Sequence, residues 1–547
     1  MIIERGHVTM NQNKADEMVA RGLDFFHQGN YEEAIKCYDE AIAFSPKNTK
    51  AWINKGKACA DQGKYEEAIR CYDKALYINP NYIKAWYNRG VVFGDMGKYE
   101  EEIKCYDKVL EIEPKDVDVW YNKGLALISL GKYGEAAKCY DKTLELNPGC
   151  VDSWYNKGKA LALHRKFNEA IICYDRAIEL KPEYLKDLWY NKGEALANFG
   201  KHEDAIIAYD TAIKIAPDYA SPWCGKGNVF YAQGKYKEAA TCYDTALKIK
   251  PAYAEAWYYK GLVMNELGKH DEEIKCYDAA ININPLYAKA LYSKGLIMAV
   301  QGNHREAIAC FDKVLLINPE DYRIYTDKGK SLSALGDYEE AIKCFNKSLD
   351  HYPDDDFIWY DKGKALSSLE KYEEALECYE KTLSIYPDHA YALYKKGTTL
   401  FSMGKYSDAI KSFDKVLKVV KDDYMVYYDK GRALAYMEQH GEAVKCFNKA
   451  LKINPGHTDS WNSKGESLIM LKKFTSAIEC YNKAIELAPS STIALCGKGL
   501  ALYKQKKYED ALEYSEKGLE LEPGNLSLED LHKKCINKLA VNYGYIK

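Results

Sequence analysis

Residues 84–114, KAWYNRGVVFGDMGKYEEEIKCYDKVLEIEP, decide the fold. Trp86, Gly90 and the phenylalanine after them stand at i, i+4 and i+7, the spacing of one helix face. Gly97 predicts the end of that helix, because glycine accepts the left-handed conformation of a C-terminal cap. A second amphipathic stretch follows and ends at Pro114, since proline cannot continue a helix. The stretch therefore predicts a hairpin of two helices.

The same pattern recurs every 34 residues along nearly the whole chain. All nine tryptophans lie four residues before a glycine equivalent to Gly90, and a proline follows that glycine by 24 residues in fourteen of fifteen units. A fixed period of this size indicates a repeat array, because one such unit is too small to bury a core alone and must stack on its neighbours. The fifteen repeat glycines are Gly22, Gly56, Gly90, Gly124, Gly158, Gly193, Gly227, Gly261, Gly295, Gly329, Gly363, Gly397, Gly431, Gly465 and Gly499.

The offsets of the large residue, glycine, tyrosine, alanine, aromatic residue and proline resemble those of the tetratricopeptide repeat, over residues 15–525. The resemblance implies an all-α fold, a right-handed α-α superhelix of fifteen helical hairpins whose first helices line a concave groove. We expect residues 1–14 to be a loose N-terminal segment and residues 526–547 to form a capping helix and tail. One extra residue falls near 183–188 and Pro222 follows, and these irregularities predict either a kink or groove boundary near residues 183–225 or a tolerated loop insertion.

Composition argues against several classes of function. A net charge of −4, with 29% charged residues, gives no strong attraction for nucleic acid. No apolar run approaches the length of a membrane span and no secretory leader is evident, so we expect a cytoplasmic protein without membrane insertion. The histidines are scattered and no nucleotide-binding, nucleophile or zinc-protease motif is present. We expect neither an enzyme nor a cofactor.

Twelve of the seventeen cysteines share one position in the second helix of their unit. Equivalent atoms of stacked units should lie about 8–10 Å apart, whereas a disulfide needs Cα atoms within about 7 Å. We expect these cysteines to be small packed residues, with a redox or metal role as the alternative.

Candidate binding residues occupy the two positions that follow the tryptophan. An amide offers a donor and an acceptor together, which suits the backbone of an extended peptide. In similar superhelical arrays an asparagine at the second position lines the groove and bonds such a peptide. The alternative is that these amides only satisfy neighbouring groups of the chain. The asparagines are Asn54, Asn88, Asn122, Asn156 and Asn191, and the tyrosines of the first position beside them are Tyr87, Tyr121, Tyr155 and Tyr190, for which binding and helix packing weigh equally.

We therefore expect a non-catalytic protein–protein interaction scaffold that binds an extended peptide segment in the groove of its first half. The alternative is an assembly subunit that acts through its convex face or its ends, with self-association possible. No metal or other cofactor enters either hypothesis.

A basic residue precedes the repeat glycine in all fifteen units, and an acid lies eighteen residues later in twelve of them. Because a lone buried lysine is costly, we expect an ion pair between the two helices of one unit. For Lys123 the expected partner is Asp141. A solvated stripe and a cationic track for an acidic ligand are the alternatives.

Overall fold

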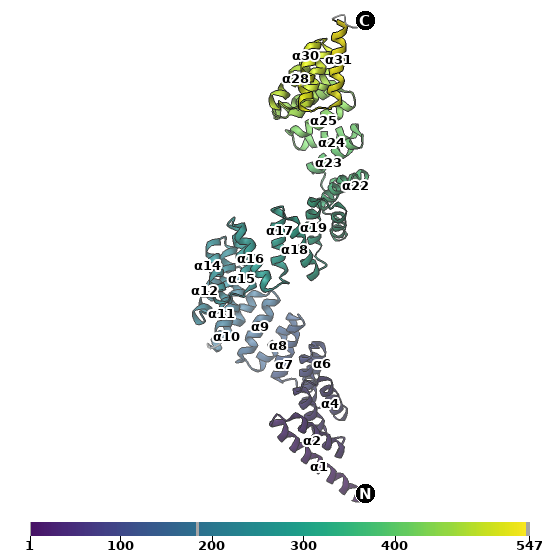
Figure 1. Cartoon of the computed structure of the whole chain (residues 1–547). Helices are drawn as coiled ribbons and strands as arrows, with labels where there is room; N and C mark the ends of the chain where they lie inside the picture. Colours follow the sequence, from purple (N-terminus) through teal and green to yellow (C-terminus); the bar gives the residue numbers. More distant parts are fainter. Residues whose placement is uncertain (1, 182–184, 543–547) are drawn as a thin grey trace. The chain divides into compact units, whose positions relative to one another are not determined.

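The computed structural model describes residues 2–181 and 185–542, and within them the chain is a series of paired α-helices (Figure 1). The first helices of the hairpins are α1 Ile2–His27, α3 Thr49–Asp61, α5 Ile83–Asp95, α7 Val117–Ser129, α9 Val151–Leu163, α11 Leu185–Phe199, α13 Ala220–Ala232, α15 Ala254–Glu266, α17 Ala288–Val300, α19 Tyr322–Leu335, α21 Asp356–Ser368, α23 Ala390–Ser402, α25 Tyr424–Tyr436, α27 Thr458–Met470 and α29 Thr492–Lys504. The second helices are α2 Tyr31–Phe44, α4 Tyr65–Ile78, α6 Tyr99–Ile112, α8 Tyr133–Leu146, α10 Phe167–Leu180, α12 His202–Ile215, α14 Tyr236–Ile249, α16 His270–Ile283, α18 His304–Ile317, α20 Tyr338–His351, α22 Tyr372–Ile385, α24 Tyr406–Val419, α26 His440–Ile453, α28 Phe474–Leu487 and α30 Tyr508–Leu521, and α31 Leu526–Asn542 follows them.

The helix ends lie where the sequence predicts them. Gly97 has φ of 71°, in the left-handed region, and the equivalent glycines of other hairpins share this conformation. Where the hairpin has no glycine at this position, a polar residue such as Arg165 or Lys472 takes the same positive φ. The prediction of glycine-capped helical hairpins is confirmed.

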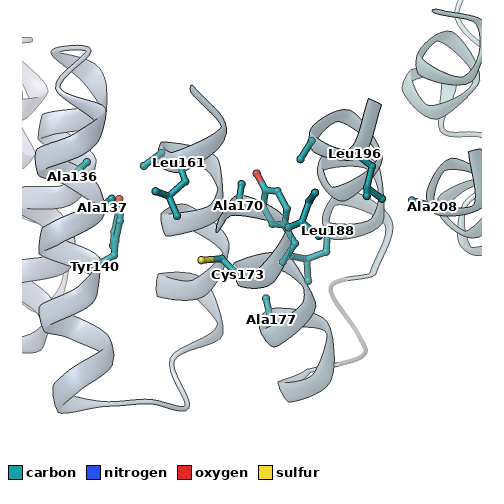
Figure 2. Close-up of a cluster of buried hydrophobic side chains, with 14 of the residues drawn as sticks. Ala136, Ala137, Tyr140, Leu161, Ala170, Cys173, Ala177, Leu188, Leu196 and Ala208 are labelled. Carbon is teal, nitrogen blue, oxygen red and sulfur yellow. The ribbon is translucent and has the colours of Figure 1, made fainter. Parts of the chain in front are cut away.

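The repeat glycine lets the two helices of a hairpin approach closely. A Cβ atom placed on Gly124 would lie 2.7 Å from Cζ of Tyr140, whose ring is fully buried against it. Figure 2 shows Tyr140 within a core that continues from hairpin to hairpin through small residues such as Ala170 and Cys173. From Leu127 to Val229 the core therefore continues through successive stacked hairpins, as the repeat predicts.

A hydrogen bond joins the tryptophan and the proline of the repeat, and the sequence pattern alone does not predict it. Trp86 donates its indole N–H to the carbonyl oxygen of Pro80 at 2.8 Å, and Trp120 does the same to Pro114 at 2.9 Å. The tryptophan thereby satisfies a carbonyl near the end of the preceding helix, where no helical partner exists.

The chain divides into two units, residues 1–284 and 285–547. Within the first unit α3 contacts α5, and α9 contacts α11, in addition to the contacts inside each hairpin. Among the described residues no comparable contact joins one even-numbered helix to the next. The first helices therefore crowd together on the inner side of the stack, which places their exposed residues on one continuous surface.

Three regions differ in detail from the regular hairpins. Residues 2–14, expected to be a loose segment, lie in α1, which begins at Ile2. The insertion expected near 183–188 lies partly outside the described residues, but α11 has 15 residues where α9 and α13 have 13. At the C-terminal end α31 packs against α29 and α30 through buried leucines and Cys535.

The ion-pair prediction is wrong in its choice of partner. Lys123 Nζ lies 2.6 Å from Oδ1 of Asp107 on α6 of the preceding hairpin, and Asp141 pairs instead with Lys157 of the following hairpin at 2.6 Å. The equivalent inter-hairpin pairs are Lys55–Asp39, Arg89–Asp73, Lys192–Asp175, Lys226–Asp210, Lys260–Asp244, Lys328–Asp312, Lys396–Glu380 and Lys430–Asp414.

Helix geometry explains the partner. Gly124 faces Tyr140 of its own hairpin, and the residue before it points about 100° around the helix. That direction faces the preceding hairpin. Lys123 also lies 5.3 Å from the centre of the ring of Trp120, three residues earlier on the same helix. The charged stripe therefore joins neighbouring hairpins rather than the helices of one hairpin.

Candidate functional site

The five candidate asparagines lie at one position of α3, α5, α7, α9 and α11, the first helices that form the inner side of the first unit. All five side chains are half-buried, as are the four candidate tyrosines. The structure thus aligns these residues along successive helices, one asparagine per hairpin.

Three of the asparagines bond to a tyrosine of the preceding hairpin. In each case the amide Nδ2 donates to the tyrosine hydroxyl, 35 or 36 residues earlier in the chain. We name these contacts the Tyr–Asn rungs. They are Tyr87–Asn122 at 3.1 Å, Tyr121–Asn156 at 2.9 Å and Tyr155–Asn191 at 3.1 Å.

The rungs occupy much of the donor capacity of the amides. Asn156 also donates to the carbonyl oxygen of Asp152 at 3.0 Å, and Asn191 to that of Asp187 at 2.7 Å. In residues 2–181 and 185–542 no hydrogen bond reaches the Oδ1 atoms of the rung asparagines. Each rung therefore keeps one acceptor, the amide oxygen, and one donor, the hydroxyl proton of the tyrosine.

The first two asparagines stand outside this pattern. One unit before Asn54 and Asn88, the tyrosine position holds Val19 and Ile53, which have no hydroxyl group. The amides of these two asparagines therefore form no rung.

The series ends after α11 for a steric reason. The position that would continue it is Gly225, where a Cβ atom would lie 2.7 Å from Cζ of Tyr209 and 2.9 Å from Oε1 of Glu194. Glu194 accepts the hydroxyl of Tyr209 at 2.5 Å and fills this space, so that Tyr190 has no rung partner. The series of rungs therefore ends at α11, and the groove boundary expected near residues 183–225 stays a prediction.

The three rung tyrosines and Tyr190 also take part in packing. Their rings lie against the buried aromatic residue of their own hairpin, with centroid distances of 5.9 Å for Tyr87–Tyr106, 5.8 Å for Tyr121–Tyr140, 6.3 Å for Tyr155–Tyr174 and 6.1 Å for Tyr190–Tyr209. The two roles weighed for these tyrosines are compatible, because ring and hydroxyl make separate contacts.

Burial and a nearby acid keep the rung hydroxyls protonated. Burial raises the pKa of Tyr87, the charge of Asp118 raises it further, and the hydrogen bond from Asn122 opposes both. Burial and Asp152 likewise raise the pKa of Tyr121. At neutral pH these hydroxyls are donors.

Hollows lie beside two of the rung asparagines. One of about 350 Å³ between α5 and α7 is lined by Tyr87, Asn122 and the buried Glu102, whose pKa burial raises. Another of about 250 Å³ between α9 and α11 is lined by Asn191 and Leu163, among others. Such hollows can receive side chains of a chain that crosses the rungs.

The second unit contains the same inter-hairpin contact with aspartate in place of asparagine. Tyr292 donates to Asp327 at 2.8 Å and Tyr394 donates to Asp429 at 2.7 Å. Burial raises the pKa of Asp429, although Arg432 lies 3.4 Å away. In these contacts the tyrosine donates the hydrogen bond, whereas in the Tyr–Asn rungs it accepts one. The aspartate form therefore leaves a negatively charged acceptor.

No metal centre is evident in the part of the chain that the structure describes, since nowhere do three histidine, cysteine or acidic side chains gather suitably. None of the cysteines there forms a disulfide, and all but Cys150 and Cys496 are buried, which fits the expected packing role. No helix within residues 2–181 or 185–542 has the length and apolar character needed to cross a bilayer.

Family models match the hairpins along most of the chain. Models described as TPR repeat match residues 22–62, 56–97, 193–234 and 227–268, and models described as tetratricopeptide repeat match residues 83–116, 117–150, 151–184, 254–285, 354–422, 424–457, 458–491 and 492–525. The chain belongs to the tetratricopeptide repeat family. A model described as anaphase-promoting complex, cyclosome, subunit 3 also matches this TPR protein, over residues 300–382.

Solved structures resemble the TPR chain at low sequence identity. The structure of Naa15/Naa10 bound to HypK-THB is 14% identical over 97% of this chain and 97% of that chain, with a TM-score of 0.36. YrrB, described as a TPR protein with an unusual peptide-binding site, is 23% identical over 35% of this chain and 99% of its own, with a TM-score of 0.32. MamA from Desulfovibrio magneticus is 25% identical over 31% and 97%, with a TM-score of 0.31. A search among curated proteins gave no match.

Proposed function

We propose that this TPR protein is a non-catalytic scaffold that binds an extended segment of a partner protein along the inner side of its first unit. The observation that carries the proposal is the series of Tyr–Asn rungs, which presents the same donor and acceptor on three successive hairpins. The near balance of charge favours a protein partner over nucleic acid, and the free thiols fit a cytoplasmic location.

The spacing of the rungs suits a peptide backbone. Neighbouring helices lie about 8–10 Å apart and an extended chain rises about 3.3 Å per residue, so one rung corresponds to about three residues. The amide oxygen can accept a peptide N–H while the tyrosine hydroxyl donates to a peptide carbonyl. This differs from the expected ladder, in which each asparagine supplied both groups.

The affinity expected from such contacts is modest. Each hydrogen bond contributes about 0.5–1.5 kcal/mol net, and ordering the bound segment offsets several kcal/mol. With Asn54 and Asn88 included as acceptors, we expect a micromolar dissociation constant.

Two triple variants test the proposal by capture of partners from a cell extract. Asn88→Ala/Asn122→Ala/Asn156→Ala removes the amides. The second variant changes the same three positions to aspartate. At positions 122 and 156 the carboxylate can keep the inter-hairpin hydrogen bond by accepting it from the tyrosine hydroxyl, as in Tyr292–Asp327, so that the hydroxyl is no longer a free donor. At position 88, which forms no rung, the change removes the amide. Both variants should lose the partners that the wild type captures.

The matched control changes Lys74, Lys108 and Lys142 to alanine, because these side chains are exposed on second helices. This control variant should retain the partners. In the captured complex, hydrogen exchange of the TPR protein should be slower in α5 to α11 than in the free protein. Unchanged recovery with both triple variants would reject the proposal.

The alternative function is that of an assembly subunit acting through the convex face or the ends. The match to a model named after a complex subunit, over residues 300–382, favours it. The mass of the pure protein in solution distinguishes the two functions. A stable oligomer supports the assembly subunit, and a monomer supports the scaffold that binds an extended segment.

A further inference from the structure

A second hollow with the chemistry of a binding site lies at the C-terminal end of the other unit. It has a volume of about 470 Å³ and is bounded by α27, α29 and the beginning of α31. Its lining includes polar Asp459, Asn462 and Glu466 and apolar Met470, Ile493 and Leu500.

Asn462 is the unusual member of this lining. It is 8% exposed, and its Oδ1 atom has no hydrogen-bond partner. A buried acceptor without a partner is unfavourable, because it has lost water and gained nothing in exchange. A donor that enters the hollow can satisfy this amide.

The repeat explains why the amide lacks a partner. Asn462 holds the position of the rung tyrosines, and the next hairpin should supply the other half of the contact. In the hairpin before it, the residue 35 positions after Tyr428 is Ser463, which carries a hydroxyl group, but the residue opposite Asn462 is Gly497, which has no side chain. A Cβ atom there would lie 2.3 Å from the ring of Tyr481.

The charges around the hollow favour a cation. Asp459 and Glu466 are exposed acids in its lining, which contains no lysine or arginine. Arg432 lines an adjoining hollow and lies 3.4 Å from Asp429. An entering ammonium group therefore meets two carboxylates and no fixed positive charge of the hollow itself.

The apolar part of the lining favours a cation on a hydrocarbon stem. Met470 is 60% exposed, Ile493 68% and Leu500 37%, although all three border a site lined by acids. A lysine side chain combines a four-carbon stem with a compact ammonium group that carries three donors.

We infer that this hollow binds a lysine side chain of a partner protein, with its stem against Met470, Ile493 and Leu500 and its ammonium group beside Asp459, Glu466 and the Asn462 amide. The site contains none of the five candidate asparagines and does not depend on the Tyr–Asn rungs.

The test follows methyl-labelled methionine in the full chain by NMR, because the chain has only ten methionines and Met470 lines the hollow. The probes are the N-acetyl, N-methylamide derivatives of lysine, norleucine, arginine and glutamate, at up to about 100 mM. We expect the lysine derivative to shift the Met470 signal saturably and to bind about tenfold more tightly than norleucine. Buried Met264 of the first unit serves as the internal reference.

Matched variants assign the effect to the acids. Asp459→Asn/Glu466→Gln should weaken lysine binding about tenfold, whereas Glu479→Gln/Glu486→Gln on α28, with the same change of net charge, should leave it unchanged. The methionine spectrum of each variant shows whether it is folded. No saturable shift, equal binding of norleucine or arginine, or full lysine affinity in the Asp459/Glu466 variant would each overturn the inference.

Discussion

Reversing one charge of the inter-hairpin stripe tests the stacking of the array. Lys123→Glu replaces an ammonium group 2.6 Å from Asp107 by a second carboxylate. The lysine side chain is 19% exposed and the aspartate 47% exposed, so the pair is only partly screened by water. We expect the substitution to loosen the contact between α6 and α7.

The expected loss of stability on Lys123→Glu follows from the contacts that the substitution removes. The ion pair contributes about 0.2–1 kcal/mol, the contact of Lys123 with the Trp120 ring about 0.5–1 kcal/mol, and the new repulsion costs about as much as the pair contributed. The total is about 2 kcal/mol. Adding Asp107→Lys should recover about 1 kcal/mol relative to the sum of the two single changes.

A second double variant, Lys123→Glu/Asp141→Lys, decides between Asp107 and Asp141 as the partner of Lys123. Asp141 pairs with Lys157, so a lysine at this position adds a repulsion and the losses should simply sum. Native-state hydrogen exchange of peptides from α6 to α9 is the suitable measurement, because a long repeat array does not unfold in two states. Recovery with Asp141→Lys, or strict additivity with Asp107→Lys, would refute the inter-hairpin assignment.

Three further predictions concern the core and the rungs. Gly124→Ala should lower local stability by about 1–3 kcal/mol despite the better helix propensity of alanine, because the new Cβ lies 2.7 Å from the buried ring of Tyr140. Gly131→Ala should cost about 1 kcal/mol, because φ is 74° while the nearest atom to a Cβ there is the Tyr133 hydroxyl at 4.0 Å; hydrogen exchange measures both effects. Tyr121→Phe removes the hydroxyl that accepts from the next hairpin at 2.9 Å and should cost about 0.5–1.5 kcal/mol between α7 and α9 in the same measurement. Burial raises the pKa of Tyr38 to about 12, so its contribution to stability is complete below about pH 10, the ordinary tyrosine pKa, and is lost as the pH rises through 12; tyrosinate absorbance should lag behind that of the urea-unfolded chain between these values.

The hairpin was predictable because each of its signals is local. Gly97 ends a helix through its own backbone conformation, and Gly124 announces a close neighbour through its missing side chain. The partner of Lys123 was not predictable in this way. A period of 34 residues places an acid both eighteen residues after the lysine and sixteen before it, and only the direction of the side chain on the helix decides between them.

The candidate site was predictable as a line of residues but not as a set of contacts. The sequence places Asn122, Asn156 and Asn191 on successive first helices, yet it does not show that each amide bonds a hydroxyl of the hairpin before it. A signal was present, because tyrosine stands 35 or 36 residues before these three asparagines and not before Asn54 or Asn88. To recognise this signal one must know that a residue of one first helix faces the residue 35 or 36 positions later on the next, and the 34-residue period alone does not give this spacing.

The direction of the hydrogen bond between tyrosine and asparagine or aspartate differs between the two units. Asn122 donates to Tyr87 and leaves the hydroxyl proton free, whereas Asp327 accepts the proton of Tyr292 and leaves only negative oxygen atoms. A peptide backbone needs a donor and an acceptor, so the asparagine form suits it better than the aspartate form. The aspartate form suits a cationic side chain, which is also the chemistry of the hollow beside Asn462. Because asparagine and aspartate differ only in one terminal group, a single repeat plan can present a neutral surface in one unit and an anionic one in the other, and we expect segments rich in lysine to discriminate between them.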